Sequence, residues 1–309
     1  MEYKQTRQGF ADALVEIGHE NERVVVLDCD VGKSTKASDF GQVFPTRFFN
    51  CGVQEANMMA VAAGLALEGF IPIASSFGVF AACRATDQIR NSIAYPKLNV
   101  KIGATHCGIT VGEDGASHQA IEDIALMRAI PNMTVIAPGD YKEAKLATKA
   151  AINFDGPCYL RFGRDRCPVV EEIHGDFQIG RAKVIRNGKD VSIVTTGIMV
   201  SEGLKAADML SQQGYSARVI HMPTIKPLDQ GVLLQAARET RAIITAEEHS
   251  IIGGLGEAVA GYLSEQHPTV VVRIGLHDTF GQSGKAEALM DYYGLRAKNI
   301  VEAALRVVR

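Results

Sequence analysis

One acid and two aromatic residues stand in a strongly apolar part of the chain. Glu55 begins the apolar run EANMMAVAAGLALEG, and Phe77 and Phe80 follow the next apolar segment. A carboxyl group in an apolar setting can share a proton at neutral pH, because burial disfavours its charged form. Aromatic rings beside it offer a stacking surface. This combination suits a heteroaromatic cofactor on which a proton must be moved.

Both features also have ordinary structural explanations. The helix dipole favours an acid at the start of a helix, which would account for Glu55 without any ligand. Two phenylalanines three positions apart, such as Phe77 and Phe80, usually pack in a core. These residues alone leave both explanations open.

The loop over residues 105–119, THCGITVGEDGASHQ, holds a second group of polar side chains. They lie between glycines, directly after an expected strand, and are His106, Glu113, Asp114, Ser117 and His118. Open α/β sheets bind ligands beyond the carboxyl ends of their strands, so these residues are candidates for substrate contact. The alternative is a solvated loop in which Asp114 or Ser117 caps the next helix.

Apolar segments alternate with helical patterns in the first half, which indicates a parallel α/β sheet. Strands are expected at Val24–Leu27, Ile71–Ser75, Val100–Ala104 and Thr134–Ile136. Helices are expected over residues 54–67, 81–94 and about 119–129.

The second half repeats this alternation. Strands are expected at Val191–Thr195, Ala217–His221, Ala242–Ala246 and Val270–Ile274, and helices over residues 200–213, 228–239, 257–264 and 297–308. Mixed charge and few periodic apolar positions between Asp165 and Asp190 are typical of a linker. The sequence therefore predicts a domain at 1–165, a linker at 166–188 and a domain at 189–309. Each domain is expected to be a three-layer α/β unit with a parallel sheet.

Composition excludes several classes of partner. Of the 309 residues, 47% are hydrophobic and 22% charged, and the net charge is -3 without a basic run. Nucleic acid and anionic membranes are therefore poor partners, and no apolar stretch reaches the roughly 18 residues of a membrane span. The six cysteines form no CxxC pair, which favours reduced thiols and a cytoplasmic location. The eight histidines lack metal-ligand spacing, so no metal site is predicted in this chain.

Six motifs together resemble the C-terminal half of a transketolase, with its pyrimidine-binding and C-terminal domains, over nearly the whole chain. They are GVQE at 52–55 before AAGLA, GEDG-x-x-HQ at 112–119, PNM-x-V-x-x-P at 131–138, YLRFGR at 159–164, KPLD at 226–229 and EEH-x-x-x-GGLG at 247–256. Deoxyxylulose-phosphate synthases share many of these motifs. The β-subunits of pyruvate-dehydrogenase-type decarboxylases share fewer.

The resemblance implies a thiamine diphosphate enzyme. Glu55 would hydrogen-bond the pyrimidine N1′ and promote removal of the thiazolium C2 proton, and Phe77 and Phe80 would stack on the pyrimidine. A third aromatic residue that is common in transketolases is replaced by Cys83 in this chain. Asp30 would lie near the cofactor.

The resemblance also implies two groups of substrate-binding residues. The hydroxyl groups of a ketose donor would be bound by His106, Asp114 and His118, and His118 would also act in catalysis. The sugar phosphate would be held by Arg7, Ser34 and Arg164, since arginine forms bidentate contacts with phosphate.

Thiamine enzymes hold Mg²⁺ and the diphosphate with a GDG motif and a downstream asparagine. This chain has no GDG motif. The resemblance therefore implies a partner, an N-terminal transketolase subunit that carries the diphosphate-binding domain and Mg²⁺, in an α2β2 assembly.

The function implied is that of the C-terminal subunit of a split transketolase, which transfers a two-carbon ketol unit between sugar phosphates. One alternative is a thiamine enzyme subunit that decarboxylates a 2-oxo acid. The other is an assembly subunit whose catalytic site has decayed, which the cysteine at position 83 keeps open.

Overall fold

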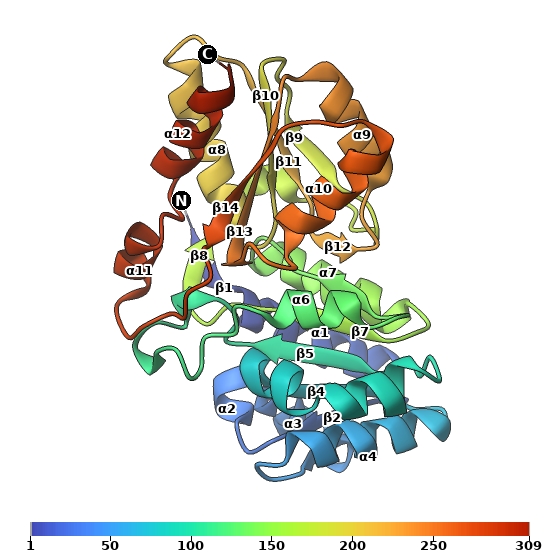
Figure 1. The fold of residues 1–309 in the computed structure, drawn as a ribbon. Helices are drawn as coiled ribbons and strands as arrows, with labels where there is room; N and C mark the ends of the chain where they lie inside the picture. Colours follow the sequence, from blue (N-terminus) through green and yellow to red (C-terminus); the bar gives the residue numbers. More distant parts are fainter. Residues whose placement is uncertain (1, 309) are drawn as a thin grey trace.

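The computed structural model describes residues 2–308, and two sheets dominate it (Figure 1). The first sheet has seven strands, in the spatial order β12 (Thr224–Lys226), β6 (Thr134–Ile136), β7 (Cys158–Arg161), β5 (Lys101–Thr105), β4 (Ile71–Phe77), β2 (Val24–Asp28) and β3 (Phe48–Asn50). All neighbours are parallel except β12, which pairs antiparallel with β6. The second half of the chain thus contributes an edge strand to the first sheet.

Helices cover both faces of the first sheet, because its strands carry apolar side chains on both sides. One face packs against α4 (Glu55–Leu67), α6 (Asp123–Ala129) and the irregular helical segment 80–94. The other face packs against α1 (Thr6–Glu20), α3 (Ser38–Val43) and α7 (Tyr141–Asn153). The result is the expected three-layer α/β unit.

The second sheet has five strands, in the order β14 (Val271–Leu276), β13 (Ile243–Ser250), β10 (Val191–Thr195), β11 (Ala217–His221) and β9 (Lys183–Arg186). Its first four strands are parallel, and β9 is antiparallel to β11. One face packs against α8 (Met199–Ser211) and α12 (Ala297–Val308), and the other against α9 (Gln230–Glu239) and α10 (Leu255–Gln266) (Figure 1). This is a second three-layer unit.

The interval predicted as a linker contains regular structure. The strand β8 (Arg166–Pro168) pairs antiparallel with β1 (Tyr3–Gln5), and β9 belongs to the second sheet. A 3₁₀ helix at Glu171–Ile173 lies between them. The backbone N–H of Val170 donates to a carboxylate oxygen of Asp140 at 2.8 Å, which ties this interval to the first unit.

All eight strands expected from the sequence are present, and two expected helices differ. In place of a regular helix over 81–94, the structure has a π-helix at Phe80–Arg84, a short α5 (Thr86–Gln88) and a second π-helix at Ile89–Ala94. The helix expected from about residue 119 begins at Asp123, because a turn and an isolated bridge between Cys107 and Ala120 precede it. Within residues 2–308, no helix is both long and apolar enough to cross a membrane.

Candidate functional site

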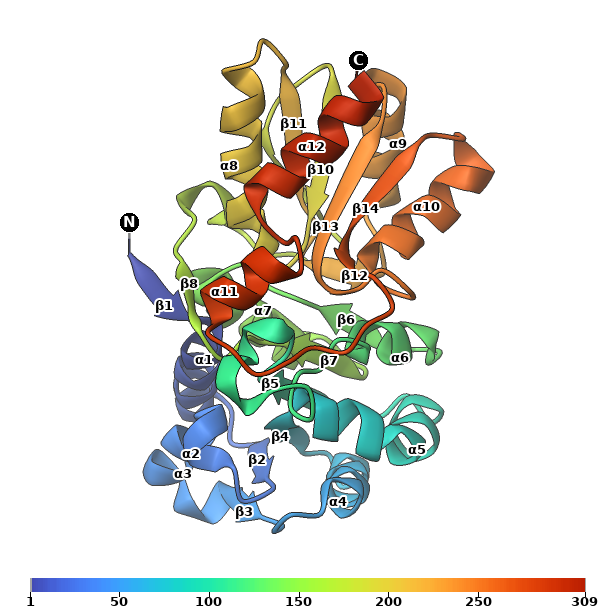
Figure 2. The ribbon, with the colours of Figure 1, turned by 60° about the vertical axis from the view of Figure 1, so that its left-hand side comes forward.

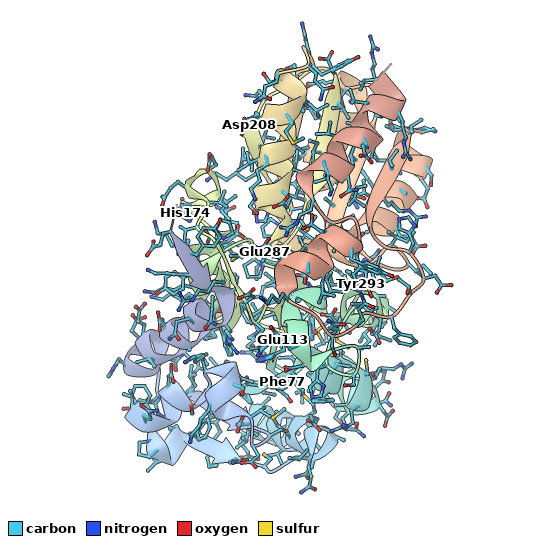
Figure 3. The ribbon with its side chains drawn as sticks, turned by 90° about the vertical axis from the view of Figure 1, so that its left-hand side faces the viewer. Phe77, Glu113, His174, Asp208, Glu287 and Tyr293 are labelled. Carbon is cyan, nitrogen blue, oxygen red and sulfur yellow. The ribbon has the colours of Figure 1, made fainter. Side chains whose placement is uncertain are left out.

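The predicted substrate residues converge at the carboxyl edge of the first sheet. The strands β2, β4, β5 and β7 are neighbours, so the residues that follow them meet in space. A cavity of ≈ 600 Å³ lies there, lined by Arg7, Lys33, Ser34, Lys36, Phe77, His106, Asp114, His118 and Arg164. It brings together all six residues predicted to bind a sugar phosphate, together with one of the two predicted stacking rings. Figure 3 shows Phe77 on this edge, below Glu113 and Glu287.

His106 occupies a constrained position directly after β5. Its φ of 56° lies in the left-handed region, which is rare for residues other than glycine and clusters at functional sites. Its Nε2 lies 3.2 Å from Nη1 of Arg7, and its Nδ1 lies 2.9 Å from Oγ1 of Thr105. Because a guanidinium only donates, Nε2 accepts and the proton of the neutral ring is on Nδ1. The ring also stacks on Phe77, with centroids 3.9 Å apart.

Burial, followed by the positive charges of Arg7 and Arg164, lowers the pKa of His106 from 6.5 to about 3. The unfolded chain therefore binds more protons than the folded chain between these two values. The contribution of His106 to stability is complete above pH 6.5 and is lost as the pH falls toward 3.

We expect His106 to remain neutral between about pH 5 and 8, so that it binds a ligand hydroxyl as a neutral ring. An NMR titration of the imidazole resonances would show this, with His106→Gln identifying the signal. A midpoint near the ordinary value of 6.5 would contradict this protonation state.

The cavity is strongly positive. Arg7 donates to the backbone oxygen of Ser34 at 2.7 Å, and Arg164 donates to Val111 and to a carboxylate oxygen of Glu113 at 3.2 Å. Burial and the nearby charge of Arg164 lower the pKa of Arg7. Two guanidinium groups held this close favour an anionic ligand between them.

Sequence reasoning missed two cations in this cavity, Lys33 and Lys36. Both come from the short helix α2 (Gly32–Thr35) and its C-cap, where Lys36 has a φ of 71°. The cavity therefore holds four cations and one acid, Asp114. The four-residue GKST match at 32–35, which lacks the glycine of a P-loop, was the only signal for them.

The second unit contacts and stabilises the loop that carries His118 and Asp114. The buried Gln119 donates from its Nε2 to the backbone oxygens of Ile109 at 3.1 Å and Gln282 at 3.0 Å. Oε1 of Glu248 accepts from the backbone N–H of Thr110 at 2.6 Å. In Figure 2, α11 (Ala286–Tyr292) lies against this loop. The C-terminal half of the chain thus fixes the loop that carries the candidate substrate residues, as well as forming its own core.

Glu55 is the first residue of α4 and is 1% exposed. Its Oε1 lies 3.4 Å from Oγ of Ser76, and its Oε2 lies 2.8 Å from Nη1 of Arg84. Ser76 directly precedes Phe77, so the strand β4 carries both the hydroxyl that contacts Glu55 and one of the two predicted stacking rings. Phe77 and Phe80 are partly exposed and stack at 6.0 Å, with 23° between their planes. A buried acid therefore lies beside an accessible aromatic pair, as predicted.

Phe80 connects the aromatic pair to the cavity. Its ring packs edge-on against His118, with centroids 5.3 Å apart and 76° between the planes. His118 also accepts from or donates to Oγ of Ser117 at 2.9 Å through its Nδ1. The aromatic pair and the loop at 105–119 are therefore in direct contact.

Like Glu55 and Phe80, Asp30 and Cys83 do not line the cavity. Asp30 is exposed after β2, and its carboxylate accepts from Nδ2 of Asn50 at 3.0 Å. Its assignment to the cofactor stays a prediction. Cys83 is exposed beside the aromatic pair, and its Sγ lies 3.8 Å from Oε1 of Glu122. Partial desolvation and that carboxylate raise the pKa of the Cys83 thiol to about 12, so the thiol is protonated near neutral pH.

Comparisons with known proteins agree with this geometry. The family "Transketolase, pyrimidine binding domain" matches residues 2–169, and "Transketolase, C-terminal domain" matches residues 180–300. A protein of Methanocaldococcus jannaschii named as a transketolase C-terminal section is 47% identical over 99% of this chain and 97% of its own length. A subunit of a 6-deoxy-6-sulfo-D-fructose transketolase from Clostridium is 42% identical over 97% and 94%.

A solved structure described as a split gene transketolase, inactive beta4 tetramer, is 52% identical, with a TM-score of 0.92 over 98% of both chains. The chain belongs to the transketolase family, and it contains the pyrimidine-binding and C-terminal domains of that family. The family implies thiamine diphosphate as the cofactor.

Proposed function

We propose that this chain is the C-terminal subunit of a split transketolase, which transfers a two-carbon ketol unit between sugar substrates with an anionic terminus. The observation that carries the proposal is the junction of Glu55, Phe77 and Phe80 with the positive cavity after β2, β5 and β7. An acid for proton transfer, a stacking surface and an anion site are thus provided at one sheet edge.

The residues present fit the pyrimidine end of thiamine diphosphate. Glu55 would hold a proton at N1′, and the accessible faces of Phe77 and Phe80 would stack on the ring. The cofactor supplies the centre that stabilises a carbanion and carries the two-carbon unit. The protein orients the ring and, through the apolar helix α4, keeps water from the acid.

The cavity would bind the sugar. Neutral His106, together with His118 and Asp114, would hydrogen-bond its hydroxyl groups, while Arg7, Ser34 and Arg164 would hold its anionic end. His118 lies against both Phe80 and the cavity, which suits the catalytic role predicted for it. The sulfo-sugar named for the Clostridium relative also ends in an anion, in keeping with a positive cavity.

A partner subunit would hold the diphosphate and Mg²⁺. Among residues 2–308, no group of three or more His, Cys, Asp or Glu side chains could hold a metal ion, and the sequence lacks the GDG motif. The relatives that this chain matches along nearly their whole length are named as a C-terminal section and a subunit. We therefore infer an N-terminal subunit and an α2β2 assembly.

A donor assay tests this function. The chain is co-expressed with a GDG-containing chain from the same genome, and turnover is measured with a ketose phosphate, the unphosphorylated ketose and pyruvate. We expect turnover of the ketose phosphate, a higher KM for the unphosphorylated ketose and no decarboxylation. Turnover of pyruvate alone would establish the 2-oxo acid alternative, and no turnover with bound cofactor would establish a decayed assembly subunit.

A further inference from the structure

Arg84 makes the two contacts that the proposed function assigns to the cofactor's pyrimidine. Its Nη1 lies 2.8 Å from Oε2 of Glu55, and its guanidinium lies over the ring of Phe80, 4.6 Å from the centroid. The planar cation therefore uses both the proton-transfer acid and a stacking face.

The local backbone directs Arg84 back toward Glu55. Arg84 ends the π-helix that begins at Phe80, in the place where the sequence predicts a regular helix. Such segments are rare and occur mostly at functional sites, because the wider turn changes the direction of the following side chains. The irregular segment thus places the side chain of Arg84 against the carboxylate of Glu55.

The contact also has a physical reason in the chain without cofactor. The Glu55 side chain is 2% exposed, and a buried carboxylate without a cationic or hydrogen-bonding partner is strongly disfavoured. Apart from the weaker 3.4 Å contact with Ser76, only Arg84 supplies such a partner among the described residues.

Little else holds Arg84 in place. Its side chain is 50% exposed, and within residues 2–308 it donates no hydrogen bond other than the one to Glu55. A half-exposed arginine with one ion pair and one stacking contact can turn into solvent at low cost. Glu55 therefore requires a partner because it is buried, while Arg84, its partner here, can leave easily because it is half-exposed.

We propose that Arg84 is an autoinhibitory placeholder that occupies Glu55 and Phe80 until the cofactor's pyrimidine displaces it. This inference rests on the proposed function, because it assumes that Glu55 and Phe80 receive the pyrimidine. Displacement keeps the buried acid paired at every stage, and breaking the ion pair and the stacking contact lowers the affinity of the site for the cofactor.

The test is the equilibrium Kd of thiamine diphosphate with Mg²⁺, measured by calorimetry on the complex with the partner subunit and without sugar. Arg84→Met keeps an unbranched side chain but removes the ion pair. We expect the Kd to fall roughly tenfold, which corresponds to about 1.4 kcal/mol. The matched control is Arg90→Met, because Arg90 is also exposed in the same irregular segment and donates to Asn91 at 2.6 Å. We expect no change in its Kd.

An unchanged or weaker Kd for Arg84→Met would overturn the inference, since Arg84 would then be irrelevant to the cofactor or a permanent partner of Glu55. If Arg84→Met does not fold, Arg84→Lys is measured instead, and it should bind cofactor more tightly by a smaller factor because it keeps the charge but loses the planar stack. Failure of the wild-type complex to bind the cofactor at all would contradict the proposed function, so the two failures are distinguishable.

Discussion

In the complex with the partner subunit, Glu55→Gln is expected to lower kcat by about 10²–10⁴-fold, the usual contribution of a positioned acid or base. The amide is similar in size and can still occupy the buried site at the start of α4. It cannot exchange a proton with N1′ of the pyrimidine. Steady-state kinetics with a ketose phosphate, together with the Kd of the cofactor, would separate lost chemistry from lost binding.

Glu68→Gln is the matched control, because Glu68 is an exposed acid at the C-terminal end of the same helix. It should leave kcat unchanged. If the Glu55→Gln complex kept most of its rate with cofactor bound, the assignment of proton transfer to Glu55 would be wrong.

The second large effect is expected on stability, from Asp123→Asn. The Asp123 carboxylate accepts from Nε of Arg161 at 2.9 Å and from the hydroxyl of Tyr159 at 2.8 Å, with both charged side chains buried. Burial alone would raise the pKa of Asp123, yet Arg161 and its other partners keep it below the usual value. Removing this charge leaves Arg161 buried and uncompensated, which costs about 3–5 kcal/mol of unfolding free energy.

The loss of stability in Asp123→Asn should involve both domains. Arg161 also donates to the backbone oxygens of Ala120 in the first domain, at 3.2 Å, and of Glu248 in the second, at 3.0 Å. Urea denaturation measures the decrease in the free energy of unfolding. Asp208→Asn is the control, since neither side chain of the pair of Asp208 with Arg186 is buried and such pairs contribute about 0–1 kcal/mol. Equal losses for the two variants would contradict the importance given to the buried pair.

Periodicity and chain direction predicted that the loop at 105–119 would lie at the carboxyl edge of the first sheet. Four-residue apolar runs such as Val24–Leu27 identify buried strands, and parallel strands bring their carboxyl ends to one edge. His106, Asp114 and His118 were therefore expected at that edge, whereas Arg7, Ser34 and Arg164 entered only through the resemblance to transketolases. Their roles came from the resemblance to transketolases, and those roles remain predictions.

The sequence did not predict features that depend on long-range side-chain contacts. The contact of Arg84 with Glu55 spans 29 positions and follows from a π-helix, which has no periodic apolar signal. The strand β12 is three residues long and joins a sheet formed by the other half of the chain. The bond from Gln119 to Gln282 links positions 163 apart. Local patterns do not encode such pairings, because tertiary packing selects them.

We infer that this chain supplies the pyrimidine site of a thiamine enzyme whose diphosphate site belongs to a partner. Calorimetric titration of thiamine diphosphate and Mg²⁺ tests it most directly, with the isolated chain compared with the chain in complex with the GDG-containing partner. We expect saturable binding by the complex and none by the isolated chain. Tight binding by the isolated chain would contradict the division of the cofactor site between two subunits.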